Sequence, residues 1–391
     1  MTWWARAQIV HVPGAPRSRA PPLAPYGTIH ACPHVVTGMQ IGLYNFGDSM
    51  PDAATGEQID QGTRIRNVLE EIEVADASGL DVVALGEHHR PEFAISSPTT
   101  VLAAAATRTE RIRLSSGVTV LGSEDPIRVY QQFATIDQIS RGRAEVMAGR
   151  GSFIESFPLF GQDLGQYDDI FAEKLDLLLN VRDNLVVTHT GAHRPSIDAR
   201  EVYPRAFQEQ LPVWLAIGGT PESAVRAADL RLPLALAIIG GEFRHFEPMT
   251  RLYRKAWAEF GHDPATLQLG INAHGFVGES TQEAQDLVYP TYQAMMNQIG
   301  RERGWQPRGR GHYDHECAPG GALLIGSVDD VVEKLLDYHA VFGNTRFLIK
   351  MSASPLQHEA TLRSIELLGK EVAPRVRAEV ARRDVAAAAG L

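Results

Sequence analysis

The chain has 391 residues, of which 44% are hydrophobic and 21% are charged, proportions typical of a folded globular protein and not of a disordered one. Its formal net charge of −10 argues against nucleic acid or an acidic membrane surface as the main partner, because both attract a basic surface. Two cysteines, Cys32 and Cys317, are too few for a disulfide framework or a four-cysteine metal site. Because no apolar run reaches the ~18–20 residues that span a membrane, we expect a cytoplasmic protein.

Residues 1–38 differ in composition from the rest of the chain. They contain no acidic residue, three arginines and six of the 23 prolines, so they carry +3 while the remaining residues carry −13. A stretch so rich in proline cannot keep a helical or strand-like period. We expect a poorly ordered leader or a misassigned start, with the folded chain opening at Met39. A basic tail with its own function and a secretory signal are the alternatives.

From Met39 onward, short apolar runs alternate with stretches of helical spacing. Eight runs are predicted strands: Met39–Tyr44, Asp81–Gly86, Arg113–Val120, Arg143–Ala148, Val213–Ile217, Pro233–Ile239, Leu267–Val277 and Arg346–Met351. Helices are predicted between and after them, at Asp60–Ser78, Pro98–Thr109, Pro126–Ile139, Asp168–Leu185, Pro221–Asp229, Glu247–Phe260, Thr281–Arg303, Val328–Phe342 and Glu359–Glu371.

Strands that alternate with helices pair in parallel, and eight such units in ~350 residues favour an α/β fold, a closed (β/α)8 TIM barrel with insertions at its C-terminal face. An open, doubly wound sheet is the alternative. It lacks its best support, because Asn45-Phe46-Gly47-Asp48 stands where a glycine fingerprint would follow the first strand. We expect one barrel domain over residues 39–377, followed by a C-terminal tail over residues 378–391.

In such a barrel, catalytic groups lie where strands end and loops begin. The second predicted strand ends in Gly86-Glu87-His88-His89-Arg90. A histidine there can act as an acid, a base or a hydrogen-bond donor near neutral pH, and Glu87 can orient it or accept a hydrogen bond from a ligand. An ordinary polar loop is the alternative. We expect no metal, because adjacent histidines at a strand end rarely converge on one ion.

Two further junctions have the residues of an anion site. After the fourth strand, Gly149 and Gly151 allow close backbone approach, Arg150 supplies a fork of donors, and Ser152 adds a hydroxyl. After the fifth strand, Gly218-Gly219-Thr220 precedes Pro221, so Thr220 is the predicted N-cap of a helix whose free N–H groups favour a phosphate. A simple turn and a cap without a ligand are the alternatives.

Four weaker signals remain open between a structural and a functional interpretation. Ser115-Ser116-Gly117-Val118 would let a flat ring lie against the backbone, or is only a glycine in a strand. His274 either lines the pocket or is structural. The segment Gly304–Gly321, which contains His312 and Cys317, suits a lid over the barrel mouth better than a metal cage. Ala103–Ala106 offers a small-residue helix face for a dimer interface or for packing on the barrel.

Taken together, these junctions resemble the bacterial luciferase-like flavin-dependent monooxygenase family, over nearly all of Met39 to Arg377. Each piece is short, but their order and spacing are specific. The pieces are Gly86–Phe93, Ser97–Pro98, Ile112–Val118, Asp125–Val129, Asp137–Arg143, Gly149–Gly151, Phe160–Gly161, Arg363–Gly369 and Glu371–Pro374. The resemblance implies the same barrel and a reduced flavin, usually FMN, as cosubstrate. It also implies that dioxygen forms a flavin peroxide, which oxygenates a small organic substrate.

The resemblance also implies roles for individual residues. His88 matches the catalytic histidine, and Glu87 matches the acid beside the flavin ring. Gly117 and Val118 fall where the family often has a non-proline cis peptide under the ring, and Arg150 matches an arginine near the phosphate. The phosphate loop is matched less closely by Gly218, Gly219 and Thr220.

The resemblance further implies a separate flavin reductase as partner, and we expect a homodimer. Light emission from an aldehyde is not expected, because Gly149 stands where the luciferase has its reactive cysteine. A deazaflavin-dependent hydride-transfer enzyme and a non-catalytic flavin-binding protein are the alternatives. His88 speaks against the second, since binding alone needs no histidine at the ring. A metal hydrolase barrel is disfavoured by the missing ligand set.

Overall fold

A computed structural model describes residues 38–388 of the chain, except for residues 54, 152–153 and 352. The predicted leader, apart from its last residue, therefore lies outside the described residues, and so does the predicted phosphate ligand Ser152. In the part of the chain that is described, no helix is both long enough and apolar enough to cross a membrane.

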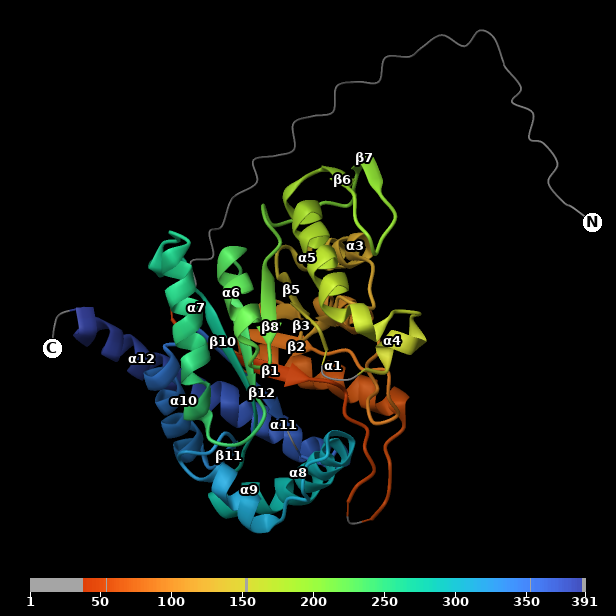
Figure 1. The fold of residues 1–391 in the computed structure, drawn as a ribbon. Coiled ribbons are helices and arrows are strands. Elements are labelled where there is room, and N and C mark those ends of the chain that lie inside the picture. Colours follow the sequence, from red (N-terminus) through yellow and green to blue (C-terminus); the bar gives the residue numbers. More distant parts are fainter. Residues whose placement is uncertain (1–37, 54, 152–153, 352, 389–391) are drawn as a thin grey trace, which may run out of the picture. The chain divides into compact units, whose positions relative to one another are not determined.

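Parallel strands form the centre of the molecule and close into a barrel (Figure 1). The barrel strands are β1 (Gln40–Asn45), β2 (Val82–Leu85), β3 (Arg113–Ser116), β5 (Ala144–Gly149), β8 (Val213–Ile217), β9 (Leu234–Ile238), β10 (Leu269–Val277) and β12 (Arg346–Met351). Closure comes from β12, which pairs with both β1 and β10, while β10 also pairs with β9. The predicted eight-stranded barrel is confirmed, and each of its strands coincides with a predicted run.

Helices surround this barrel (Figure 1). The α-helices are α1 (Gln61–Ala77), α2 (Pro98–Ala106), α3 (Pro126–Ser140), α4 (Ser156–Leu159), α5 (Tyr167–Asp183), α6 (Pro221–Asp229), α7 (Glu247–Glu259), α8 (Thr281–Arg303), α9 (Arg310–Cys317), α10 (Val328–Phe342), α11 (His358–Leu367) and α12 (Ala373–Ala388). Short 3-10 turns are η1 (Leu164–Gln166), η2 (Phe243–Phe246) and η3 (Pro264–Thr266), and η4 (Leu368–Val372) is a π-helical turn.

Helix ends follow local sequence signals. Ser327 and Asp330 form a reciprocal capping box at the start of α10, and Gly343 ends the helix in the left-handed conformation that glycine adopts most easily. Such caps, which α8 has as well in Ser280 and Gly304, explain why the observed bounds of α8 and α10 equal the predicted ones; the bounds of α6 also equal the predicted ones.

The structure adds elements that the sequence pattern did not predict. Between α5 and β8, the strands β6 (Val186–His189) and β7 (Ile197–Glu201) form an antiparallel hairpin beside α5 (Figure 1). Only Val187 of the two strands is fully buried, so the sequence lacks the alternation of apolar and polar residues that predicts a strand. The short strand β11 (Leu324–Gly326) pairs with β10. The predicted strand Arg113–Val120 is divided into β3 and the short β4 (Thr119–Val120), which pairs with β5.

The end of the chain also differs from the expected pattern. The predicted helix Glu359–Glu371 continues through η4 into α12, and the expected boundary between barrel and tail at residue 377 falls inside α12. The continuation has a physical reason, because Val372, Val376 and Val380 recur at helical spacing and are buried. This apolar stripe packs α12 against α10.

Side chains fill the interior of the barrel and close its base. A cluster of buried apolar side chains fills the space inside the strands: Val82, Ala84, Met147, Trp214, Ala235 and Leu348. Among them, Trp214 lies under the guanidinium carbon of Arg346, at 4.0 Å from the ring centroid, and Arg346 Nη2 donates to Glu145 Oε2 at 3.1 Å. Burial raises the pKa of Glu145, but Arg346 and Arg113 outweigh it and lower the pKa to about 2.

Candidate active site

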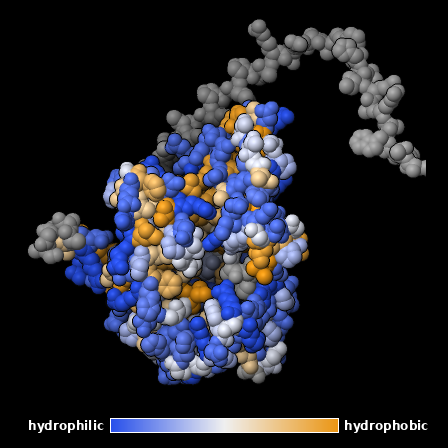
Figure 2. Space-filling view, viewed as in Figure 1, coloured by the Kyte–Doolittle hydropathy of each residue, from blue (hydrophilic) through white to orange (hydrophobic). Residues whose placement is uncertain are grey.

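A cavity of about 330 Å³ opens at the carboxyl ends of the barrel strands. Figure 2 shows it as a hollow near the middle of the face displayed. The structure brings seven of the predicted site residues to its wall: Glu87, His88, Val118, Arg150, Gly151, Gly218 and Thr220. Gly117 and Gly219 are the chain neighbours of lining residues. This position, outside the C-terminal ends of the strands, is where a barrel of this type holds its active site.

His88 stands at the end of β2 with 7% of its surface exposed. Its ring packs against two phenylalanine rings, with centroid distances of 4.6 Å to Phe46 and 4.4 Å to Phe93, which also contact each other at 5.8 Å. Its Nδ1 atom is 4.0 Å from a carboxylate oxygen of Glu155. Burial lowers the pKa of His88 to about 4, with Asp48 acting in the opposite direction, so the imidazole is neutral at neutral pH. A neutral imidazole can both donate and accept a hydrogen bond at the cavity wall.

The Glu87 carboxylate is held by its neighbours and is 4% exposed. One oxygen lies 2.9 Å from Nε2 of His89, and the other accepts a hydrogen bond from the backbone N–H of Val120 at 3.2 Å. Glu87 therefore orients His89. The same hydrogen bond raises the pKa of His89, although burial opposes it.

The chain crosses from β3 to β4 through a cis peptide bond between Gly117 and Val118, the feature that the family resemblance implied. A Cβ atom on Gly117 would collide with the ring of Tyr44 and lie 2.9 Å from Cβ of Ala84, so only glycine fits this position. Val118 in turn covers Gly149, where a Cβ atom would lie 2.9 Å from its side chain. This part of the wall is therefore tightly packed.

Arg150 follows β5 and is clamped at the cavity wall. Its Nη1 atom pairs with Oδ1 of Asp168, and its Nη2 atom donates to Oγ1 of Thr220 at 3.3 Å. Its guanidinium carbon lies 5.2 Å from the ring centroid of Tyr167. Tyr167 donates its hydroxyl to the backbone carbonyl of Arg150 at 2.9 Å, which fixes the loop after β5 as well.

The start of α6 faces the same part of the cavity. Thr220 is the N-cap by position, but its side chain makes no capping hydrogen bond and instead accepts one from Arg150. A Cβ atom added to Gly218 or Gly219 would meet nothing within 4 Å, so the backbone before α6 is open to a ligand. Free N–H groups, a helix dipole and Arg150 together form an environment that suits a phosphate.

The cavity also contains residues that sequence reasoning missed. Tyr44 and Phe46 enter from the end of β1, Asn272 from β10 and Arg303 from the end of α8. Asn272 is 4% exposed, and its Oδ1 atom has no hydrogen-bond partner among the described residues. Asn272 is a polar residue within an apolar run, and this was the signal in the sequence that could have identified it. Which side of β10 faces the cavity, however, depends on how the barrel closes.

Two of the segments with weaker signals lie outside the lining of the cavity. His274 is buried against Tyr292, at a centroid distance of 5.6 Å, and does not line the cavity. Burial lowers its pKa to about 3. The segment Gly304–Gly321 forms α9 and is fastened by Glu316, which accepts hydrogen bonds from Gly241 N–H at 2.6 Å and from the Tyr292 hydroxyl at 3.0 Å. No described residue of Gly304–Gly321 lines the cavity.

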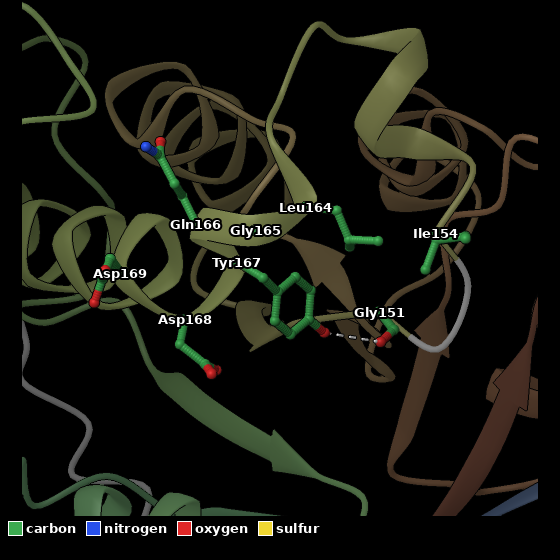
Figure 3. Close-up of a pocket in the computed structure, with 8 residues that line it drawn as sticks. All are labelled: Gly151, Ile154, Leu164, Gly165, Gln166, Tyr167, Asp168 and Asp169. Atoms are coloured by element: carbon green, nitrogen blue, oxygen red, sulfur yellow. Dashed lines mark hydrogen bonds between the residues drawn. The ribbon is translucent and has the colours of Figure 1, made fainter.

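A second, shallower hollow of about 590 Å³ adjoins the cavity (Figure 3). It shares Gly151 and Tyr167 with the cavity, and its other lining includes the exposed apolar residues Ile154 and Leu164 and the acidic residue Asp168. The two hollows are therefore adjacent, with Tyr167 belonging to the lining of both.

Known proteins resemble this chain in both sequence and fold. A family model described as luciferase-like monooxygenase matches residues 39–345. A relative from Streptomyces nodosus subsp. asukaensis, 4-hydroxyprotoasukamycin monooxygenase, is 28% identical over 338 residues, which cover 81% of this chain and 88% of the relative.

Two solved structures illustrate the likeness in fold. One is a type II Baeyer-Villiger monooxygenase, the oxygenating constituent of 3,6-diketocamphane monooxygenase from Pseudomonas putida in complex with FMN. It has a TM-score of 0.69 and 20% identity, covering 86% of this chain and 98% of that one. The other, an F420-dependent secondary alcohol dehydrogenase with an F420-acetone adduct, has a TM-score of 0.67 and 17% identity, covering 87% and 100%. At such identities the likeness shows the fold alone.

Proposed function

The chain belongs to the luciferase-like monooxygenase family, and from this we propose that it is an FMN-dependent monooxygenase that oxygenates a small organic substrate with reduced FMN and dioxygen. One observation carries the proposal: two chemically different groups of residues line a single cavity. Arg150 and the start of α6 provide an anion site in one part of its wall, and the buried, neutral His88 stands in another part. A cofactor that has both a phosphate group and a ring could place its phosphate at the anion site and its ring near His88.

The residues present fit the phosphate end of FMN. Arg150 and Thr220 already converge on one another, and Gly218 and Gly219 leave the backbone open before the free N–H groups of α6. Ser223, in the first turn of α6, also lines the cavity and adds a hydroxyl. We propose that these groups hold the phosphate, because charge-assisted hydrogen bonds from an arginine fork and from helix N–H groups are those that phosphates receive in proteins.

Other parts of the cavity wall fit a ring. Val118 and Tyr44 line this part of the wall and offer an apolar surface to a ring. Asn272 stands on β10, which is the strand diametrically opposite β3 in the order around the barrel. The unpartnered Oδ1 of Asn272 is a group whose burial costs about 1–3 kcal/mol unless it gains a hydrogen bond. We propose that the amide of Asn272 pairs with a polar edge of the bound molecule.

When bound, reduced FMN supplies the electrons that activate dioxygen. The chain supplies the surroundings: the apolar floor formed by Trp214, Met147 and their neighbours keeps water from the base of the cavity. His88 is packed against Phe46 and Phe93 in the neutral form, so it can donate a hydrogen bond to, or accept a proton from, a reacting group near neutral pH.

Anaerobic titration with reduced FMN, with reduced deazaflavin and then with air tests the proposal. We expect tight binding of reduced FMN and, in air, an absorbance transient that matches neither reduced nor oxidised flavin. Binding of the deazaflavin alone, with no reaction in air, would favour the hydride-transfer alternative, for which the fold of the F420-dependent dehydrogenase is a precedent.

Two variants test the residues. His88→Ala is expected to abolish substrate oxygenation while FMN affinity stays within about threefold, because the ring touches the reacting end and not the phosphate. Arg150→Ala is expected to weaken FMN at least about tenfold more than riboflavin, which lacks the phosphate. Equal weakening of both flavins would remove Arg150 from the phosphate site.

The same proposal includes a partner protein and a homodimer. A separate reductase would deliver the reduced flavin, and two copies would associate through the small-residue face of α2, on which Ala103 and Ala104 are half-buried. Sedimentation of the wild type and of Ala104→Glu tests the dimer, since a charge in a close-packed helix interface disrupts it.

A further inference from the structure

We propose that Asp168 is an internal competitor for the phosphate site: its carboxylate occupies donors of Arg150 that a flavin phosphate would use, and it thereby lowers the affinity for phosphorylated flavin. The inference rests on the proposed FMN site. It makes Asp168 a residue that sets how strongly the protein distinguishes FMN from riboflavin.

The geometry at Arg150 carries the inference. Nη1 of its guanidinium pairs with Asp168 Oδ1, while Nη2 bonds Thr220 at the start of α6. One guanidinium therefore links the first turn of α5 with the N-cap of α6. A phosphate placed at the start of α6 would meet the same guanidinium and would lie within a few ångströms of the Asp168 carboxylate.

Asp168 is not required to hold Arg150 in place. The ring of Tyr167 packs against the guanidinium, and the Tyr167 hydroxyl fixes the backbone carbonyl of Arg150 at 2.9 Å. The hydrogen bond to Thr220 adds a third restraint. With those contacts in place, the main effect of the Asp168 charge on a bound phosphate is repulsion.

The Asp168 carboxylate is also free to give way. Its side chain is 72% exposed and borders the shallow hollow beside Tyr167 (Figure 3). An ion pair this exposed contributes little to stability. A phosphate can therefore displace the carboxylate, but it does so against the cost of the broken pair and of the remaining like charge.

The neighbouring Asp169 provides a matched control. It stands one residue further along the first turn of α5, and its side chain points away from Tyr167 and Asp168 (Figure 3). It makes no ion pair with any described residue. Asp169→Asn changes the net charge and the helix N-terminus in the same way as Asp168→Asn, but it leaves Arg150 paired.

The experiment measures the binding of oxidised FMN and riboflavin by flavin fluorescence, for the wild type, D168N and D169N. We expect D168N to bind FMN about three- to tenfold more tightly, the range for removing one like charge near a phosphate in an exposed setting. Riboflavin affinity should stay unchanged in both variants, and D169N should change FMN affinity less than about twofold. Adding R150A to D168N should abolish the gain.

Weaker or unchanged FMN binding in D168N overturns the inference, and so does an equal gain in D169N. A second measurement, the rise in Tm with inorganic phosphate against chloride at equal ionic strength, needs no flavin. The rise should be larger in D168N than in the wild type and absent in R150A. If no flavin binds but phosphate behaves in this way, the proposed function and the flavin part of the inference fail, and competition between Asp168 and a phosphate for Arg150 remains. If FMN binds the wild type and D168N gains nothing in either assay, the inference alone fails.

Discussion

Replacing Asn272 by leucine should make the protein more stable and less able to bind flavin. Asn272 is 4% exposed on β10, and its Oδ1 atom has no partner among the described residues. An unsatisfied buried polar atom costs about 1–3 kcal/mol, and leucine removes that cost. Leucine branches as asparagine does, with two bulkier methyl groups in place of the amide oxygen and nitrogen, and the neighbouring cavity has room for them.

The size of the effect follows from the size of the folded chain. With about 350 folded residues and an unfolding entropy of about 2.1 cal/mol/K per residue, a gain of 1–3 kcal/mol corresponds to a rise in Tm of about 1–4 °C. The lost hydrogen bond to the bound molecule should weaken FMN about three- to tenfold. Differential scanning fluorimetry without flavin and fluorescence titration with FMN measure the two quantities.

Asn344 provides a contrast for this experiment. Its Oδ1 atom also lacks a partner, but its Nδ2 atom donates to the carbonyl of Arg346 at 3.0 Å and it lies outside the cavity lining. Asn344→Leu should therefore lower Tm and leave FMN affinity unchanged. A lower Tm in Asn272→Leu, or unaltered FMN affinity in that variant, would refute the reasoning about the orphaned acceptor.

The remaining predictions concern stability and pH. The pKa of His274 is lowered to about 3, so near pH 6.5 the histidine is protonated in the unfolded chain but not in the folded protein. The free energy of unfolding should therefore fall as the pH drops below 6.5. His274→Gln should make Tm depend less on pH between pH 7 and pH 5. Arg346→Met should lower the free energy of unfolding in urea by about 3–5 kcal/mol, because Glu145 loses its main partner, without affecting FMN affinity. Glu316→Gln should speed limited proteolysis within residues 304–321 at unchanged FMN affinity, since an amide cannot accept all the hydrogen bonds that the buried carboxylate accepts; unchanged cleavage would contradict this role.

Much of the barrel could be predicted from local patterns. Strands buried on both faces are continuous apolar runs, and helix bounds such as those of α10 follow caps that lie within a few residues of each other. Polar residues directly after such a run, as at His88 and Arg150, must lie at the end of a strand. A parallel barrel gathers all those ends on one side, so their proximity could be foreseen.

Other parts depend on contacts between distant segments. Asn272 and Arg303 reach the cavity only because β10 closes the barrel and α8 ends at its mouth. The partner of Glu87 depends on side-chain direction after β2, which the sequence pattern does not encode, and it is His89. The β6–β7 hairpin is held by backbone pairing of mostly exposed residues, so it leaves no apolar alternation to read.

The filled barrel interior has a consequence for the order of events in turnover. Because Trp214 and its neighbours close the base, everything that reaches the cavity enters through the mouth at the carboxyl ends of the strands. In the proposed arrangement, a flavin along the wall from Arg150 to Val118 and a substrate near His88 would therefore enter through the same opening. The molecule that enters first is covered by the second and leaves last. Steady-state kinetics should accordingly be sequential and ordered, with the oxygenated product released before the spent flavin.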